Sequence, residues 1–457
     1  MSRKTSIDMT EGPIFRKVML FALPLMLNSV INQLYTTADT VMMGQFAGTM
    51  AMAAVGASAQ PIHLLVNFFT GLSLGATVTC GNFKGGQKKK ELSECMHNAV
   101  LLGFLIGLVV LILGLLLSGP LLRAMDTPAE ILDDAIMYVK IRLASGPVWI
   151  LALFCISIFH AHGESRIPMV VSTISGIVNV GLNVLFVPVM GMGVAGVALA
   201  TDISLGLKAT VYSLILFSPK GQYQMKLSGL RLRWKYVKNI LTVGIPNGLS
   251  SIVFSFSNVL LQTSINRFGS LVVAGNTAAT ELISYTSLIL ASVRSACVSA
   301  TAQCCGANKL DRIYKLVKTV IPGCILLLIL IDIPITIFGK ALMGLIADNA
   351  EAGALGFPKL MYNCWGYILF LFVKVFSGGL AGMRKSTLTL MCDLFGIILP
   401  RVLWVWFVVP HMQSHGLIFA IYPITWLFTA ILSGVAFYHH LNALKRAASE
   451  PAPTPAP

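Results

Sequence analysis

Residues 20–48 read LFALPLMLNSVINQLYTTADTVMMGQFAG, an apolar stretch that is long enough to cross a bilayer as one helix. The stretch contains a proline near its start, Pro24, and one carboxylate, Asp39. An acid at the centre of a membrane helix costs about 2.5–3.5 kcal/mol on insertion scales, so an acid in such a position usually has a function. Asp39 is therefore a candidate proton or cation site. The alternative is that Asp39 lies at a hydrated helix end and has no role.

The composition of the whole chain predicts an all-α polytopic membrane protein. Of the 457 residues, 56% are hydrophobic and only 11% are charged, whereas soluble domains carry about 25% charged residues. The basic residues behind the net charge of +15 flank the apolar stretches and form no basic arm or face. This pattern predicts contact with the lipid bilayer and no binding of nucleic acid. The polar N-terminus and the length of the first apolar stretch argue against a cleavable signal peptide.

We predict about twelve membrane spans. They lie near residues 14–43, 51–80, 94–119, 130–158, 167–188, 193–217, 236–267, 271–304, 311–338, 355–381, 386–409 and 415–442. Lysine and arginine are concentrated at the two ends and in the loops after the even-numbered spans, whereas the loops after spans one, five and eleven contain neither. By the positive-inside rule, this alternation predicts an even number of spans with both termini in the cytoplasm.

The two halves of the chain resemble each other. Pro24 and Phe46 correspond to Pro246 and Phe268, and further pairs recur across all six spans at separations of 219 to 224 positions. Two parallel six-helix lobes that face each other across a cleft are typical of secondary transporters. We therefore expect a cytoplasmic N-terminal segment (1–13), two lobes (14–217 and 236–444), a cytoplasmic linker (218–235) and a disordered tail (445–457). No nucleotide-binding G-x-x-x-x-G-K-[ST] loop and no catalytic constellation occurs in the sequence, so neither an ATP-driven pump nor an enzyme is supported.

Five motifs, taken in their order and spacing, are similar to those of one transporter family. They are ADTVMMGQFAG at 38–48, AAVGAS at 53–58, FHAHGESRIPM at 159–169, NVGLNVLFVPVMGMGVAGVALAT at 179–201 and GLAGMRKS at 379–386. The chain resembles the bacterial multidrug and toxic compound extrusion (MATE) transporters over nearly its whole length. This resemblance implies a monomeric antiporter of the cell membrane that exports small amphipathic or cationic compounds, such as drugs and toxins. The exchanged ion would be H⁺ or Na⁺, and no other cofactor is implied.

The resemblance also implies a coupling site in the N-terminal lobe. In one branch of the family, an acid in span one meets polar residues of spans five and six, and these positions correspond here to Asp39, Asn179, Asn183 and Thr201. Another branch has an acid in the span that corresponds to residues 236–267, which here contain no Asp or Glu. The position of Asn183 is often Asp in the first branch, so the identity of the ion stays open.

The residue types by themselves allow two interpretations of this group. A carboxylate with amide and hydroxyl partners can exchange a proton as its access to water changes, and the same oxygens are suitable ligands for a small hard cation. Alternatively, Asn179 and Asn183 only join neighbouring helices through hydrogen bonds worth about 0.6 kcal/mol each.

Charged residues also occur inside the predicted spans of the second half. They are Glu281, Arg294, Lys374, Asp393 and Arg401. They either form structural ion pairs, such as Glu281 with Lys374, or they line a substrate cavity. A cavity wall that carried Lys374 and Arg401 would disfavour simple organic cations, so the polarity of the substrate stays open.

Two other classes of function are alternatives to the antiporter: a flippase, and a channel or non-transporting sensor. A flippase for a lipid-linked sugar or oligosaccharide, from a related exporter group, should have more spans and a strongly basic cavity. A channel should show a repeated polar filter sequence, and a sensor should carry a soluble output domain. Because none of these patterns is present in the sequence, the antiporter is the leading hypothesis.

Overall fold

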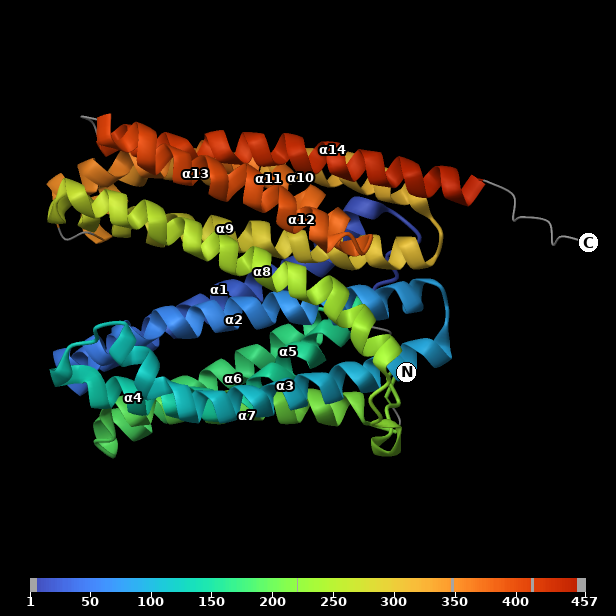
Figure 1. Cartoon of the computed structure of the whole chain (residues 1–457), viewed down its shortest axis with the longest axis horizontal. Helices are drawn as coiled ribbons and strands as arrows, with labels where there is room; N and C mark the ends of the chain where they lie inside the picture. Colours follow the sequence, from blue (N-terminus) through green and yellow to red (C-terminus); the bar gives the residue numbers. More distant parts are fainter. Residues whose placement is uncertain (1–5, 220, 347–348, 412–414, 450–457) are drawn as a thin grey trace, which may run out of the picture. The chain divides into compact units, whose positions relative to one another are not determined.

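The computed structural model describes residues 6–219, 221–346, 349–411 and 415–449, and most of these residues are helical (Figure 1). Within these ranges, eleven helices are long and apolar enough to cross a membrane, and the bent pair α4–α5 supplies a twelfth span. The prediction of an all-α protein with about twelve spans is thereby confirmed. The predicted disordered tail, 445–457, begins too early, because residues 445–449 continue the last helix; residues 450–457 and 1–5 lie outside the described residues.

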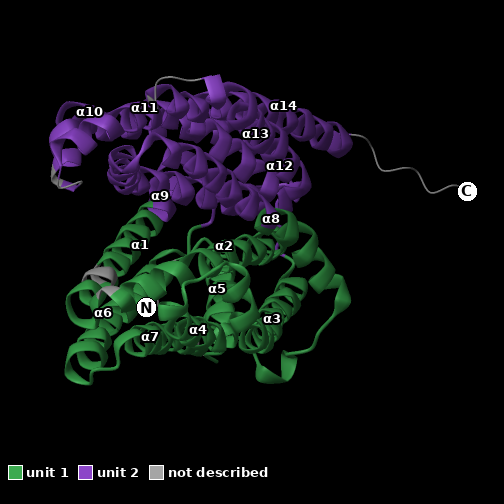
Figure 2. Cartoon of the chain, turned by 60° about the vertical axis from the view of Figure 1, so that its left-hand side comes forward, with its two compact units in different colours: residues 1–7, 23–84, 88–248 green, residues 8–22, 85–87, 249–457 purple. Residues whose placement is uncertain are grey.

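The chain divides into two compact units (Figure 2). Of the described residues, unit 1 contains those within 6–7, 23–84 and 88–248, and unit 2 contains those within 8–22, 85–87 and 249–449. The boundaries run through helices α1 and α8, because each of these long helices packs its two ends into different units. Residues 14–22 therefore belong to unit 2 and residues 236–248 to unit 1, although the sequence places them in the other half.

Unit 1 is a helical bundle with α5 inside it. It contains the part of α1 (Ile14–Met42) from residue 23 onward and the part of α8 (Trp234–Ile265) up to residue 248. Its other helices are η1 (Met43–Ala47), α2 (Gly48–Gly85), α3 (Lys89–Ala124), α4 (Ala129–Ala144), α5 (Gly146–Ala161), α6 (Arg166–Val184), η2 (Leu185–Val189), α7 (Gly193–Leu216) and η3 (Leu227–Gly229). Helix α5 packs against α3 and α7 and buries Trp149, Phe154 and Phe159 in the unit's hydrophobic core. A helix that is apolar on nearly every side is stable only when it is enclosed, and the sequence of α5 is of this kind.

The fourth span is broken rather than straight. Helices α4 and α5 meet at Ser145 with a bend of 48°, and Pro147 lies in the first turn of α5. Proline has no backbone N–H and disfavours helical geometry at the residue before it, which explains a break at this point. The Ser145 hydroxyl donates hydrogen bonds to the Arg142 carbonyl oxygen (2.9 Å) and to Asp202 Oδ1 (2.8 Å). The break therefore brings a polar group and two charged residues together inside unit 1.

Unit 2 repeats the same series of spans. Its helices are the rest of α8, from residue 249 onward, and η4 (Asn266–Phe268), α9 (Ser270–Gly306), α10 (Leu310–Ile346), α11 (Ala350–Gly382), α12 (Ser386–Asp393), η5 (Leu394–Ile398), α13 (Leu399–Leu403), η6 (Trp404–Val408), η7 (Val409–His411), η8 (His415–Ala420) and α14 (Ile421–Ser449). Helix α11 packs against α9, α10 and α14. A Cβ atom on Gly275 or Gly356 would lie within 2.2 Å of the facing backbone, so these glycines allow α9 and α11 to approach closely.

A backbone feature supports the internal repeat. Gly48, the first residue of α2, has φ +86°, and Gly269, immediately before α9, has φ +92°. The two glycines are 221 positions apart, and a Cβ on either would meet no atom within 4 Å. Glycine is therefore favoured at both positions by its backbone conformation and not by lack of space. The same chain reversal follows the first span of each half.

Candidate functional site

Unit 1 contains a polar cavity of about 350 Å³ that includes Asp39. Helices α1, α2, α4, α6 and α7 contribute its lining, which consists of Asn32, Tyr35, Thr36, Asp39, Val66, Arg142, Ser175, Gly176, Asn179, Thr201, Ser204, Leu205 and Lys208. Three of the four residues predicted for the coupling site, Asp39, Asn179 and Thr201, line this cavity. The fourth, Asn183, is fully buried and contacts Asp39 directly.

The Asp39 carboxylate is held by an amide from α6. Asn183 Nδ2 donates to Asp39 Oδ1 at 2.5 Å and also lies 3.4 Å from Asn179 Oδ1. Asn179 and Asn183 are four residues apart, so they lie on the same face of the helix. Asn183 Oδ1 is buried without a hydrogen-bond partner. The structure thus brings the acid and both asparagines together and leaves one amide oxygen free.

The hydroxyl of Thr201 has a local partner. It donates to the Val197 carbonyl oxygen at 3.0 Å, one turn earlier on α7, and the Ser204 hydroxyl donates to Ala200 in the same way at 2.8 Å. Thr201 therefore forms part of the cavity wall and makes no described hydrogen bond with Asp39.

An ion pair that the sequence analysis did not include lies on the same cavity. Arg142 of α4 forms a salt bridge with Asp202 of α7, and both side chains are largely buried. The guanidinium is also close enough to Asp39 to attract its carboxylate. The sequence could have marked Arg142 as a candidate site residue, because it is a charged residue within the predicted span 130–158. Such residues are rare in membrane spans and usually functional.

Helices α1 and α6 meet at a glycine next to this cavity. A Cβ atom on Gly176 would lie 1.7 Å from Cε2 of Tyr35, and the Tyr35 hydroxyl donates to the Thr173 carbonyl oxygen at 3.0 Å. Tyr35 lies one helical turn before Asp39. The missing side chain at Gly176 thus allows the ring to sit where α1 and α6 enclose the cavity.

The charged residues predicted for the second half do not form one group. Glu281 is exposed, and the suggested pair of Glu281 with Lys374 is not among the ion pairs of the described residues. The Lys374 ammonium lies instead over the rings of Phe254 (5.3 Å) and Phe370 (4.4 Å), and it interacts electrostatically with Asp393 and Arg294.

Besides these electrostatic interactions, the other charged side chains of this half form hydrogen bonds with neutral groups. Arg294 Nε donates to Ser377 Oγ at 3.3 Å, and Asp393 accepts a hydrogen bond from Ser250. Arg401 is fully buried. Its Nη1 donates to Ser257 Oγ (2.5 Å) and Asn258 Oδ1 (3.0 Å).

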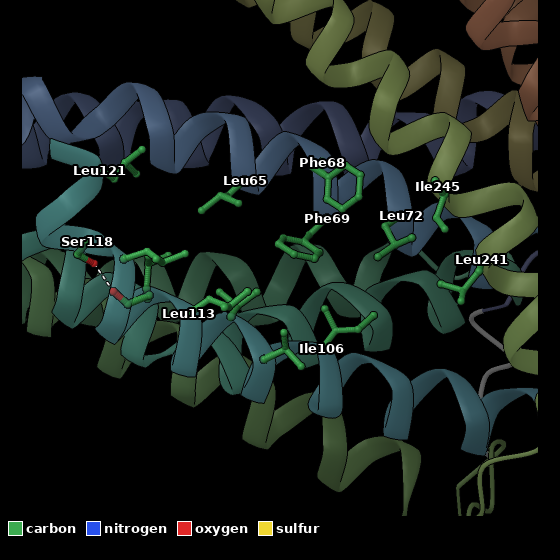
Figure 3. A pocket seen from close by; sticks show the side chains of 15 residues that line it. Leu65, Phe68, Phe69, Leu72, Ile106, Leu113, Ser118, Leu121, Leu241 and Ile245 are labelled. Atoms are coloured by element: carbon green, nitrogen blue, oxygen red, sulfur yellow. Dashed lines mark hydrogen bonds between the residues drawn. The ribbon is translucent and has the colours of Figure 1, made fainter. Parts of the chain in front are cut away.

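A larger cavity of unit 1, of about 510 Å³, has a different character (Figure 3). Its lining comes from α2, α3, α4 and α8 and includes Leu65, Phe69, Ile106 and Leu241. Ser118 is its polar side chain, and that hydroxyl donates to the Gly114 carbonyl oxygen within the same helix. Such a lining offers no charged or unpaired polar group to an ion, in contrast to the cavity that includes Asp39.

Comparison of the chain with models of known protein families gives a match to one family. The family model MatE matches the chain twice, at residues 24–185 and at residues 246–406. The chain belongs to the MatE family. The two matches begin 222 positions apart, which agrees with the offset of the sequence repeat, and each covers most of one half.

Relatives and solved structures agree with membership of the MatE family. The probable multidrug resistance protein YoeA of Bacillus subtilis is 24% identical over 392 residues, 82% of each chain. The multidrug export protein MepA of Staphylococcus aureus is 22% identical over 401 residues, 86% of this chain and 88% of MepA. The outward-facing conformation of a multidrug resistance MATE family transporter of the MOP superfamily superposes with a TM-score of 0.91 at 19% identity, over 98% of this chain and 100% of that chain. The resemblance to MATE transporters predicted from the motifs is thereby confirmed, together with the fold.

Proposed function

We propose that this MatE-family chain is a proton-coupled antiporter of the cell membrane that exports small amphipathic compounds. Alternating access of the two lobes would exchange a proton on Asp39 for a substrate molecule, with both chain termini in the cytoplasm. The observation that carries the proposal is the hydrogen bond between Asp39 and Asn183 on the wall of a polar cavity. Family membership, and the names of YoeA and MepA as multidrug proteins, support export of drug-like compounds.

Opposing effects act on the Asp39 carboxylate. Burial favours its neutral form, whereas the amide N–H of Asn183 and the nearby Arg142 guanidinium favour its charged form. A group subject to opposing effects of this kind changes protonation when its exposure to water changes. Opening the cavity to the outside would therefore load a proton, and opening it to the cytoplasm would release it.

The surroundings of Asp39 favour H⁺ over Na⁺. Asn183 presents its N–H₂ group to the carboxylate, so the amide oxygen that a metal cation would need is directed elsewhere. Arg142 and Lys208 line the same cavity and would repel a bound cation. A proton needs only the one carboxylate. The flippase alternative has no observation in its favour.

The experiment is dye transport by inverted membrane vesicles that contain the full chain. The vesicles should accumulate ethidium or the anionic dye carboxyfluorescein when the lumen is acidified, and they should not do so when only a Na⁺ gradient is imposed. Asp39→Asn should abolish the response to the pH gradient.

The matched control is Asp133→Asn, which removes a carboxylate from an exposed position on α4. This variant should transport like the wild type. A wild-type response to Na⁺ alone, or a normal pH response in Asp39→Asn, would overturn the proposal.

A further inference from the structure

A second polar cavity, of about 260 Å³, lies wholly within unit 2. Its lining comes from α8, α9, α11 and α14, and it combines one charged side chain, Lys359, with a group of aromatic rings. Neither Lys359 nor this cavity was predicted from the sequence, although a lysine within the predicted span 355–381 is the kind of residue that marks a site.

Lys359 carries a buried charge with only neutral partners. The residue is 5% exposed. Its ammonium donates to Thr280 Oγ1 at 2.5 Å and to Asn276 Oδ1 at 2.8 Å. No carboxylate of the described residues forms an ion pair with it. Burial of an ammonium without an opposite charge costs free energy, and an anion bound in the cavity would offset that cost.

Unlike Lys359, two other side chains in or near the cavity have donors without acceptors. Trp426 lines the cavity, and its Nε1 is buried without a hydrogen-bond partner. Arg401 contacts the lining residues Asn258 and Tyr422, and its Nε and Nη2 are likewise buried without partners. The carboxylates of this unit that lie in membrane spans, Asp332 and Asp393, are not among the lining residues. Among the side chains that line the cavity, Trp426 therefore has an unpaired donor, and none is a carboxylate.

The aromatic rings form a nearly parallel set. Phe370 lies 4.7 Å from Trp426 and 5.9 Å from Tyr367 between ring centroids, each at 24° between planes. Phe254 stacks on Phe370 at 5.8 Å and 14°. Because these rings cover one another and Phe370 and Trp426 are each 2% exposed, the cavity meets only part of each ring, where a further planar ring can make an offset or edge contact.

We propose that the cavity of unit 2 binds planar aromatic anions, with the carboxylate of the ligand at Lys359 and its ring against Tyr367, Phe370 and Trp426. The site supplies a substrate class for the proposed exporter and in that sense rests on the proposed function. Charge complementarity selects anions over cations, and the rings select planar over flexible compounds.

The experiment measures equilibrium binding to the purified full chain in lipid nanodiscs, with no ion gradient. The probes share one ring system and differ in charge: 2-naphthoate, neutral 2-naphthylmethanol and cationic 2-naphthylmethylammonium. 2-Naphthoate should bind most tightly. Lys359→Met should weaken 2-naphthoate binding by about tenfold or more, because truncation of one partner of a buried charge pair costs several kcal/mol, and it should leave 2-naphthylmethanol binding nearly unchanged.

Two further variants keep the test decisive. Lys340→Met removes the same charge from an exposed position on α10 and should bind like the wild type. Asn363→Asp keeps Lys359 and places a carboxylate on the cavity wall, so it should also exclude 2-naphthoate. Equal binding of the three probes, or unchanged 2-naphthoate affinity in both Lys359→Met and Asn363→Asp, would overturn the proposal. Because binding needs no gradient, this result is independent of whether transport is coupled to protons.

Discussion

Substitution of Gly176 by alanine tests the packing that encloses the Asp39 cavity. The added Cβ would lie 1.7 Å from Cε2 of Tyr35, about half of a normal contact distance, and within 2.2 Å of two further ring atoms. The ring must therefore move, and the hydrogen bond from Tyr35 to the Thr173 carbonyl oxygen is lost. Overpacking of this kind costs about 1–3 kcal/mol.

The other contributions to the stability of this variant nearly cancel. The lost hydrogen bond costs about 1 kcal/mol, and replacement of glycine by alanine inside a helix gains about the same amount. The net destabilisation should therefore be about 1–3 kcal/mol, measured as the change in unfolding free energy by thermal unfolding in nanodiscs. The displaced ring should also reduce pH-driven transport, because it lies one turn from Asp39.

The matched control is Gly181→Ala on the same helix, where a Cβ would meet nothing within 4 Å. This variant should be stabilised by up to about 1 kcal/mol. Truncation of the ring with Tyr35→Ala should restore much of the stability lost in Gly176→Ala, because the two side chains then no longer overlap. A normal stability of Gly176→Ala, or no rescue by Tyr35→Ala, would refute the packing described for α1 and α6.

Three other predictions follow from contacts in the described residues. Arg142→Met should destabilise the protein by about 3 kcal/mol, because it leaves Asp202 buried without its positively charged partner. In thermal unfolding, the double variant Arg142→Met/Asp202→Asn should lose less stability than the two single variants together. Arg312→Ala should speed cleavage after Glu11 by protease Glu-C several-fold, because the guanidinium donates to the carbonyl oxygens of Met9, Glu11 and Gly12 at 2.6–2.8 Å; an unchanged cleavage rate would contradict this. Burial, together with the nearby charge of Lys84, lowers the pKa of His162 to about 3. Between pH 6.5 and about 3, His162 is therefore protonated in the unfolded state but neutral in the folded state. The melting temperature should fall as the pH drops from 6.5 toward 3, and His162→Phe should flatten that slope.

The span pattern could be predicted from sequence because it depends on composition. Long apolar stretches and the position of basic residues reflect the bilayer, which acts on each segment separately. The break at Ser145 was not predicted, although Gly146 and Pro147 gave a local signal for it. The unit boundaries inside α1 and α8 had no local signal at all, because they depend on which helices the two ends of one continuous helix contact.

Only part of the candidate site could be predicted from the sequence. Family motifs placed Asp39, Asn179 and Asn183 together, and the structure agrees that Asn183 donates to Asp39. Arg142 was missed because the ion pair with Asp202 joins two spans 60 residues apart, and pairing over that distance depends on tertiary packing. Glu281 was grouped with Lys374 on charge alone, whereas the structure leaves Glu281 exposed and places Lys374 over two aromatic rings.

The most direct test of the central claim is proton movement driven by substrate. In proteoliposomes that contain the full chain and trap the pH indicator pyranine, a gradient of transported dye should drive protons in the opposite direction. Asp39→Asn should still exchange labelled dye for unlabelled dye but should move no protons. Proton movement at the wild-type rate in Asp39→Asn would show that Asp39 does not carry the coupling proton.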